Sequence, residues 1–191
     1  MVTNTTGKDG DKIISKWPIM PHLMDLDPAK EKFNTYKEQL EQRYLQLYGI
    51  KQDDGTYLDK EFPIDTINLI GTISYAELTA YDMETLEEWT WDTIQAINRI
   101  VLQENYIAQV LQWLTAKLNK FFIQMPSDVL PFGAQDLKFE AMAAQYPVIG
   151  WLLDERRSYD QDALYWHNQA ETLNKALRVL ERITEKMKGI L

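Results

Sequence analysis

Two long segments of the sequence, 72–125 and 151–188, contain neither glycine nor proline. These residue types interrupt helices more strongly than any others, so their absence over such lengths constrains the backbone. In both segments large apolar residues recur at spacings of three and four, which is the period of one helix face. The sequence therefore predicts an all-α chain.

The predicted architecture is an elongated bundle of three main helices with short connectors. The first helix is expected over 28–48, because Asp27 is a good N-cap acceptor and Pro28 suits the first helical position. Gly49 is expected to end it in a left-handed conformation. The third helix is expected over 148–188, after a short helix around 136–146.

The second main helix is expected over 74–124, with a break near residue 82. Ser74 and Glu77 have the spacing of a capping box, which marks a helix start. A single helix of this length would run about 75 Å, whereas a compact chain of this size measures roughly 40 Å across. Asp82 is the best candidate for a second cap, so we expect a new helix to begin there.

The first 27 residues predict an extended N-terminal arm, followed by a helical domain over 28–191. Prolines at 18 and 21 disfavour a regular helix in this arm. A compact apolar motif lies inside the otherwise polar arm: Trp17, Ile19, Met20, Leu23 and Met24. Such a motif either covers an edge of its own core or docks on another subunit, and we expect docking on a neighbour.

The net charge of −9 is concentrated in one block, residues 53–92. This block holds eleven acidic residues and one basic residue, so it carries −10 and the rest of the chain sums to +1. It is expected to attract basic partners and to repel nucleic acid. Asp54-Gly55 within it predicts a turn and leaves open a short two-stranded excursion around it.

The expected helix after residue 82 has two apolar lines. The first repeats every seven residues and predicts the face that packs on the core: Leu86, Ile100, Ile107, Leu114 and Phe121, with Thr93 as the interruption. The second line lies elsewhere on the helix: Ile94, Val101, Ala108 and Phe122, near Trp91, Leu102 and Trp113. Two apolar sides require neighbours on two sides, and a partner could supply some of them.

The final helix carries a seam with alternating spacings of three and four: Ala163, Trp166, Ala170, Leu173, Leu177, Leu180, Thr184, Met187 and Leu191. All of these positions except Thr184 are apolar, which is typical of a coiled-coil seam. Two interpretations are open. The seam is either a zipper between copies of the chain or the surface that packs on the chain's own long helix.

No pattern in the sequence indicates catalysis, a cofactor or a metal centre. The chain has no cysteine, and it has no phosphate-binding loop, nucleophile elbow or zinc-protease motif. Glu84, Glu88 and Asp92 share one helix face, as a divalent cation site would require. An acidic first turn favoured by the helix dipole explains them better, and a carboxylate-dependent metal enzyme is the least favoured function.

The leading prediction is a non-enzymatic structural or assembly protein inside a larger oligomeric complex, for example a phage or viral particle. It would be a homo-oligomer or a multi-subunit assembly. The expected partner-binding residues are the five apolar residues of the arm together with Asp82, Glu84, Glu88 and Asp92. The alternative is a helical accessory protein of DNA metabolism that binds single strands or a basic partner, although the acidic charge disfavours nucleic acid. A polar N-terminus and short apolar runs predict an intracellular or intravirion location, neither secreted nor in a membrane.

Overall fold

The computed structural model describes residues 5–6, 12–13, 17–55, 57–58 and 74–189. Helices make up most of this part of the chain, so the all-α prediction is confirmed. The short strands form two antiparallel pairs, in which β1 (Thr5–Thr6) pairs with β2 (Lys12–Ile13) and β3 (Ile50–Lys51) with β4 (Tyr57–Leu58). The second pair encloses Gly55, whose φ of +85° fits the predicted turn.

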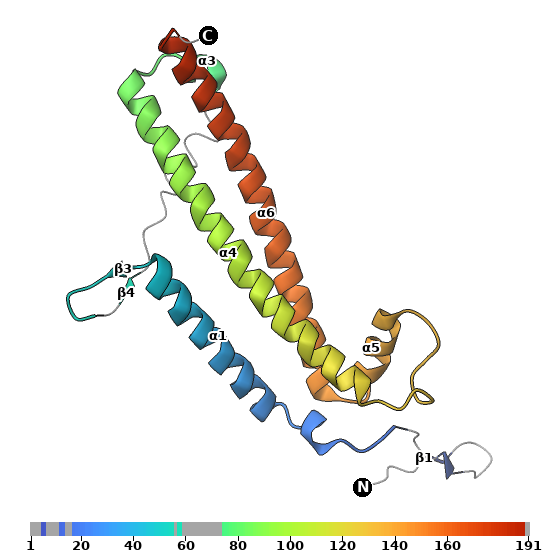
Figure 1. The fold of residues 1–191 in the computed structure, drawn as a ribbon. Coiled ribbons are helices and arrows are strands. Elements are labelled where there is room, and N and C mark those ends of the chain that lie inside the picture. The colour runs from blue at the N-terminus through green and yellow to red at the C-terminus, as the bar shows by residue number, and fades with distance from the viewer. Residues whose placement is uncertain (1–4, 7–11, 14–16, 56, 59–73, 190–191) are drawn as a thin grey trace. The chain divides into compact units, whose positions relative to one another are not determined.

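Three long helices carry the fold, and they match the three predicted ones closely (Figure 1). The helical elements in chain order are the 3-10 turn η1 (Pro21–Leu23), α1 (Asp27–Tyr48), α3 (Tyr75–Leu78), α4 (Met83–Ile123), α5 (Gln135–Ala143) and α6 (Pro147–Met187). The arm's prolines act as expected, because Pro21 begins the 3-10 turn and no α-helix is present before Asp27 in the described residues.

Two expected helix ends differ from the structure. At the start of α1 the Asp25 carboxylate accepts the main-chain N–H of Asp27 at 3.2 Å, so Asp25 satisfies this N–H group while Asp27 is already helical. Gly49 is not among the described glycines with positive φ, and its N–H still donates to the Leu45 carbonyl at 2.8 Å. A left-handed glycine is found after a different helix, because Gly189 follows α6 with φ +68°.

The predicted break near residue 82 is confirmed. The N–H and hydroxyl of Ser74 donate to Glu77 Oε2 at 2.8 and 2.7 Å, and the capping box so formed starts only the four-residue α3. The Asp82 carboxylate then accepts the N–H of Thr85 at 2.8 Å and caps α4. These hydrogen bonds hold the pKa values of Glu77 and Asp82 below their usual range, because they favour the charged carboxylates.

The chain forms two compact units, each built from segments that are distant in sequence. The first unit comprises residues 1–37 and 110–158, and the second comprises 38–109 and 159–191. Each unit therefore contains part of α1, part of α4 and part of α6. The division into an arm over 1–27 and a domain over 28–191 stays a prediction.

The first unit is held together by aromatic side chains from all three main helices. The ring of Phe33 on α1 lies 5.3 Å from that of Trp113 on α4 and 5.5 Å from that of Trp151 on α6, centroid to centroid. The Tyr36 ring stacks on that of Trp113, with the ring centroids 5.5 Å apart and the planes 18° from parallel. Aromatic pairs of this kind stabilise a fold by more than the burial of their apolar area alone provides.

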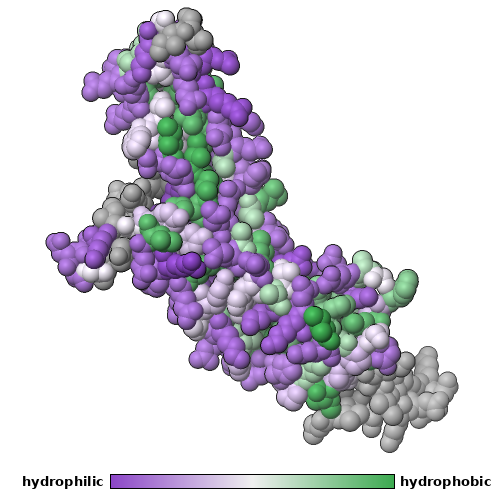
Figure 2. All heavy atoms as spheres, viewed as in Figure 1, coloured by the Kyte–Doolittle hydropathy of each residue, from purple (hydrophilic) through white to green (hydrophobic). Residues whose placement is uncertain are grey.

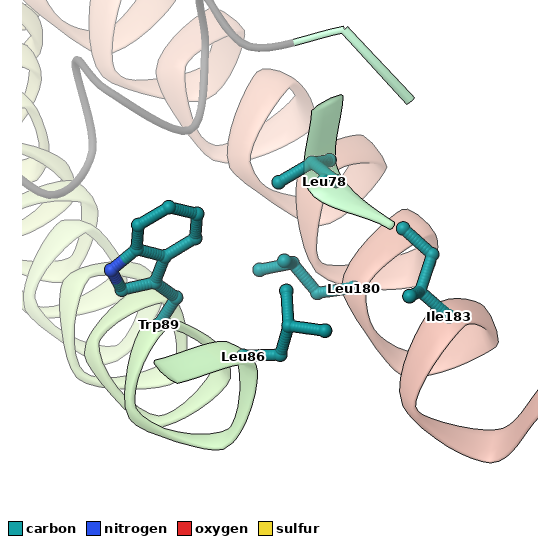
Figure 3. Packing of buried hydrophobic residues seen from close by; sticks show 5 residues of the cluster. All are labelled: Leu78, Leu86, Trp89, Leu180 and Ile183. Carbon is teal, nitrogen blue, oxygen red and sulfur yellow. The ribbon is translucent and has the colours of Figure 1, made fainter. Parts of the chain in front are cut away.

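The second unit has an aliphatic core between α4 and α6. Leu180 and Ile183 of α6 pack with Leu86 and Trp89 of α4 and with Leu78 of α3 (Figure 3). A second cluster along the same two helices joins Leu173, Trp166 and Ala170 to Ala96, Ile97 and Ile100. Most of the α6 seam is therefore covered by the chain's own α4, as in the second of the two interpretations, but Met187 is 45% exposed. Leu191 lies outside the described residues.

The sequence also predicts that the chain does not lie in a membrane, a prediction that depends on the length and hydropathy of its helices. Among the described residues, no helix combines the length and the apolar character that crossing a bilayer requires.

Candidate functional site

The apolar motif of the arm folds onto the first unit of its own chain. The Tyr146 hydroxyl donates to the Pro18 carbonyl at 2.6 Å, and the Trp17 ring meets the Tyr146 ring edge-on at 6.0 Å. Leu23 is fully buried. Burial also raises the pKa of Tyr146, since it disfavours the phenolate. These contacts hold the arm beside the start of α6.

Two of the five arm residues remain open to solvent. Ile19 is 65% exposed and Met24 is 54% exposed, whereas Trp17 and Met20 are half-buried. A neighbour that contacts the arm would meet Ile19 and Met24, because Leu23 is already used inside the unit. The prediction that the arm binds a partner is therefore narrowed to these two side chains and stays a prediction.

An open pocket of about 510 Å³ lies in the first unit between the arm, α1, α4 and α6. Aromatic and aliphatic side chains form much of its lining, and basic groups share it. The full lining is Pro21, His22, Asp25, Pro28, Ala29, Lys32, Trp113, Lys117, Lys120, Phe121, Gln124, Val148, Trp151 and Leu152. Its volume is within the range of pockets that hold small molecules.

The charge of this pocket is opposite in sign to that of the chain. Lys32, Lys117 and Lys120 line it together with a single acid, Asp25, which also accepts the N–H of Asp27. The Lys117 ammonium lies 4.9 Å from the centre of the Trp113 ring, a cation–π geometry. The pocket could hold an anionic group at its lysines and an apolar or planar group against its rings.

The four acidic residues predicted to bind a partner lie at the start of α4, and they have different surroundings. Asp82 is engaged as the cap. Glu84 and Glu88 are exposed, and Asp92 is half-buried. Among the described residues, no group of three histidines, aspartates or glutamates is arranged to hold a metal ion. Part of the predicted acidic block, residues 56 and 59–73, lies outside the described residues.

One face of α4 in the second unit is exposed, and it carries the second apolar line of the sequence. Six residues form this face, which we name the outer line: Trp91, Ile94, Asn98, Val101, Asn105 and Ala108. Trp91 is 61% exposed and Val101 is 43% exposed, while Ile94 is half-buried. Figure 2 shows apolar residues at the surface among hydrophilic ones along the part formed by α4 and α6. None of the six residues is charged, whereas a solvated helix face normally is.

The two asparagines of the outer line were missed by reasoning from apolar residues alone. Asn98 follows Trp91 by seven residues, and Asn105 follows Asn98 by seven. No hydrogen bond joins either side-chain amide to a described residue. A search for uncharged residues at heptad spacing, including amides, would have found them. Phe122, the remaining member of the predicted second line, is half-buried. Of the residues near that line, Leu102 is half-buried and Trp113 lies in the aromatic cluster.

The flanks of the outer line are fixed by other contacts in the second unit. On one flank, α1 packs against α4, where the Tyr106 hydroxyl donates to Glu41 at 3.1 Å and the Gln109 amide donates to the Tyr44 hydroxyl at 2.9 Å. Burial raises the pKa values of both Tyr44 and Tyr106, so both phenols are neutral. On the other flank, the Glu104 carboxylate lies 3.4 Å from His167 Nδ1 on α6. The outer line is thus an exposed strip between two occupied faces.

Comparison with other proteins supplies no relative from which a role could be carried over. No protein-family model matches the chain, and no curated protein or solved structure shows significant similarity to it.

Proposed function

We propose that this chain is a non-enzymatic structural or assembly protein that works inside a larger oligomeric complex, for example a phage or viral particle. It contacts its partners through exposed helix surface and not through a reaction centre. The observation that carries the proposal is the outer line of α4, an uncharged and exposed helix face with Trp91 and Val101 on it. Exposed aromatic and aliphatic residues on one helix face are typical of a surface that another protein covers.

The site chemistry supports the same function. Of the four acids at the start of α4, Asp82 caps the helix, Glu84 and Glu88 are exposed and Asp92 is half-buried, and the described residues hold no cluster suited to a metal ion. The exposed Glu84 and Glu88 would add attraction to a basic partner next to the outer line. The arm contributes Ile19 and Met24 as a second apolar contact.

The test is the mass of the full chain in solution, measured by light scattering after size exclusion over a range of concentrations. A mass above that of the 22.4 kDa chain that rises with concentration is expected. A monomer at every concentration would contradict the proposal. Two arm variants, Ile19→Asp and Met24→Asp, show whether the arm contributes, and Lys30→Asp on the exposed side of α1 is a control for the added negative charge.

A second candidate function is binding of single-stranded nucleic acid, in the manner of an accessory protein of DNA metabolism. The pocket of the first unit favours it, because lysines beside aromatic rings can hold a phosphate and stack a base. The net charge of −9 opposes it, so binding is expected to be weak and confined to low salt.

Quenching of tryptophan fluorescence by a thymidine oligonucleotide tests this second function, with a gel shift at low salt as the companion measurement. Trp113 and Trp151 line the pocket, so a bound base would quench them. Lys32→Glu should abolish the quenching. Lys30→Glu, two residues away on α1 and outside the pocket lining, should not. If the wild type shows no quenching at low salt, the function is excluded.

A further inference from the structure

We propose that α4 pairs with the α4 of a second copy of this chain, in parallel and in register, through the outer line. This inference rests on the proposed assembly function and names its partner. Three features of the outer line carry it: the spacing of its residues, the position of its asparagines and its lack of charge.

The spacing is that of a coiled-coil seam. From Trp91 to Ala108 the successive intervals are three, four, three, four and three residues. Trp91 and the two asparagines thus occupy one seam position, and Ile94, Val101 and Ala108 occupy the other. Residues at these intervals form a stripe that faces a second helix over its length. Because α4 is already formed in the single chain, pairing does not require the helix to fold first.

The asparagines select the partner and its direction. In a parallel pairing each seam position faces its own copy, so Asn98 lies opposite Asn98 and Asn105 opposite Asn105, and the two amides in each layer can hydrogen-bond to each other. In an antiparallel pairing each asparagine would face a residue of the other seam position, such as Val101. The amide would then be buried without a partner, which is costly. An unrelated apolar helix would also bury the asparagine amides without a hydrogen-bond partner.

The lack of charge makes this strip the place where two acidic chains can approach. With a net charge of −9, two copies repel each other over most of their surfaces. The six residues of the outer line bring no charge into the contact, and the Glu104 carboxylate beside it lies 3.4 Å from His167 Nδ1. The buried asparagine layers weaken the association relative to an all-apolar seam, and in return they fix the register.

Single cysteines test the arrangement, because the natural chain has none. Asn98→Cys and Asn105→Cys are oxidised separately as full chains, and disulfide-linked dimers are counted on a non-reducing gel. Both variants should cross-link efficiently to themselves. In an antiparallel pair the two positions, about 10 Å apart along the helix, cannot both face their own copies. Leu164→Cys, an exposed position on α6 away from the outer line, is the control and should cross-link poorly.

A charge variant provides the second measurement. Val101→Glu places two carboxylates opposite each other in the proposed seam and should lower the association constant at least about tenfold. Leu164→Glu adds the same charge at an exposed site of α6 and should leave it unchanged. Circular dichroism checks that each variant keeps its helices.

The outcomes separate this inference from the proposed function. A wild type that is oligomeric, together with cysteines at 98 and 105 that do not both cross-link, overturns the parallel pairing and leaves the assembly function standing. If the wild type is oligomeric and Val101→Glu does not lower its association constant, the parallel pairing is likewise overturned and the assembly function stands. A wild type that is monomeric at every concentration overturns both.

Discussion

The seam of α6 and the outer line of α4 lie in the same unit and have the same spacing, yet only the α6 seam is largely covered. Leu173, Leu180 and Ile183 on the α6 side pack against α4. Trp91 and Val101 of the outer line are exposed. Heptad spacing therefore shows that a helix face is suited to a neighbour, but it does not show whether the same chain supplies that neighbour.

The polar residues inside each stripe explain part of the difference. Thr184 interrupts the α6 seam, and its hydroxyl donates to the Leu180 carbonyl one turn earlier, so it can be buried without an unpaired group. In the outer line no described residue accepts a hydrogen bond from the amide of Asn98 or Asn105. A face that carries such amides is less suited to a cis contact with an apolar helix.

The largest expected effect distinguishes the covered stripe from the exposed one. Leu180→Ala removes a fully buried side chain from the cluster with Leu86 and Trp89, so we expect the free energy of unfolding to fall by about 2–5 kcal/mol. Val101→Ala on the outer line should change it by less than about 0.5 kcal/mol in the monomer. Urea unfolding followed by circular dichroism measures both.

Protein concentration is the control for this pair of variants, since association would stabilise the folded state. At low protein concentration, Leu180→Ala and Val101→Ala should differ most in their free energy of unfolding, because Val101 is then uncovered. If Leu180→Ala proved as mild as Val101→Ala there, the α6 seam would not be the packing surface, and the comparison would fail.

A smaller effect is expected at the polar position inside the covered seam. Thr184→Val replaces a buried hydroxyl by a methyl group, and the Leu180 carbonyl still accepts a main-chain N–H in the helix. We expect the free energy of unfolding to rise by up to about 1 kcal/mol, because a buried methyl gains more than this local hydrogen bond provides. Thermal unfolding of the full chain measures it.

Thr172→Val is the matched control for Thr184→Val. Thr172 makes the same type of bond, to the Asn168 carbonyl at 2.9 Å, but it is exposed. Its replacement should therefore change stability less. A loss of stability in Thr184→Val larger than that in Thr172→Val would mean that the hydroxyl is needed where it is buried.

Much of the fold could be predicted from local signals in the sequence. The three main helices follow from apolar spacing and from the positions of glycine and proline, and the break at residue 82 follows from a side chain that can cap a helix. The candidate site was less accessible. The fold-back of Trp17 and Leu23, and the exposure of the outer line, depend on contacts between residues far apart in the sequence, which periodicity does not encode.

An effect of comparable size concerns the cap at the start of α4, the helix that carries the outer line. Asp82→Ala removes the acceptor of the Thr85 N–H, and we expect the melting temperature at neutral pH to fall by about 2–4 °C. Asp82→Asn keeps an acceptor but loses the charge, so its melting temperature should lie between those of the wild type and Asp82→Ala.

The pH dependence of the cap follows from the lowered pKa of Asp82 in the folded chain. A carboxyl group with a lowered folded pKa contributes stability above its unfolded pKa of about 3.9, and this contribution is lost as the pH falls through the folded value. The difference in melting temperature between the wild type and Asp82→Ala should therefore be full at pH 7 and should shrink below pH 4. An equal difference at pH 7 and at pH 3 would show that the charge of Asp82 does not contribute to the start of α4, and that its side chain caps the helix as a neutral acceptor.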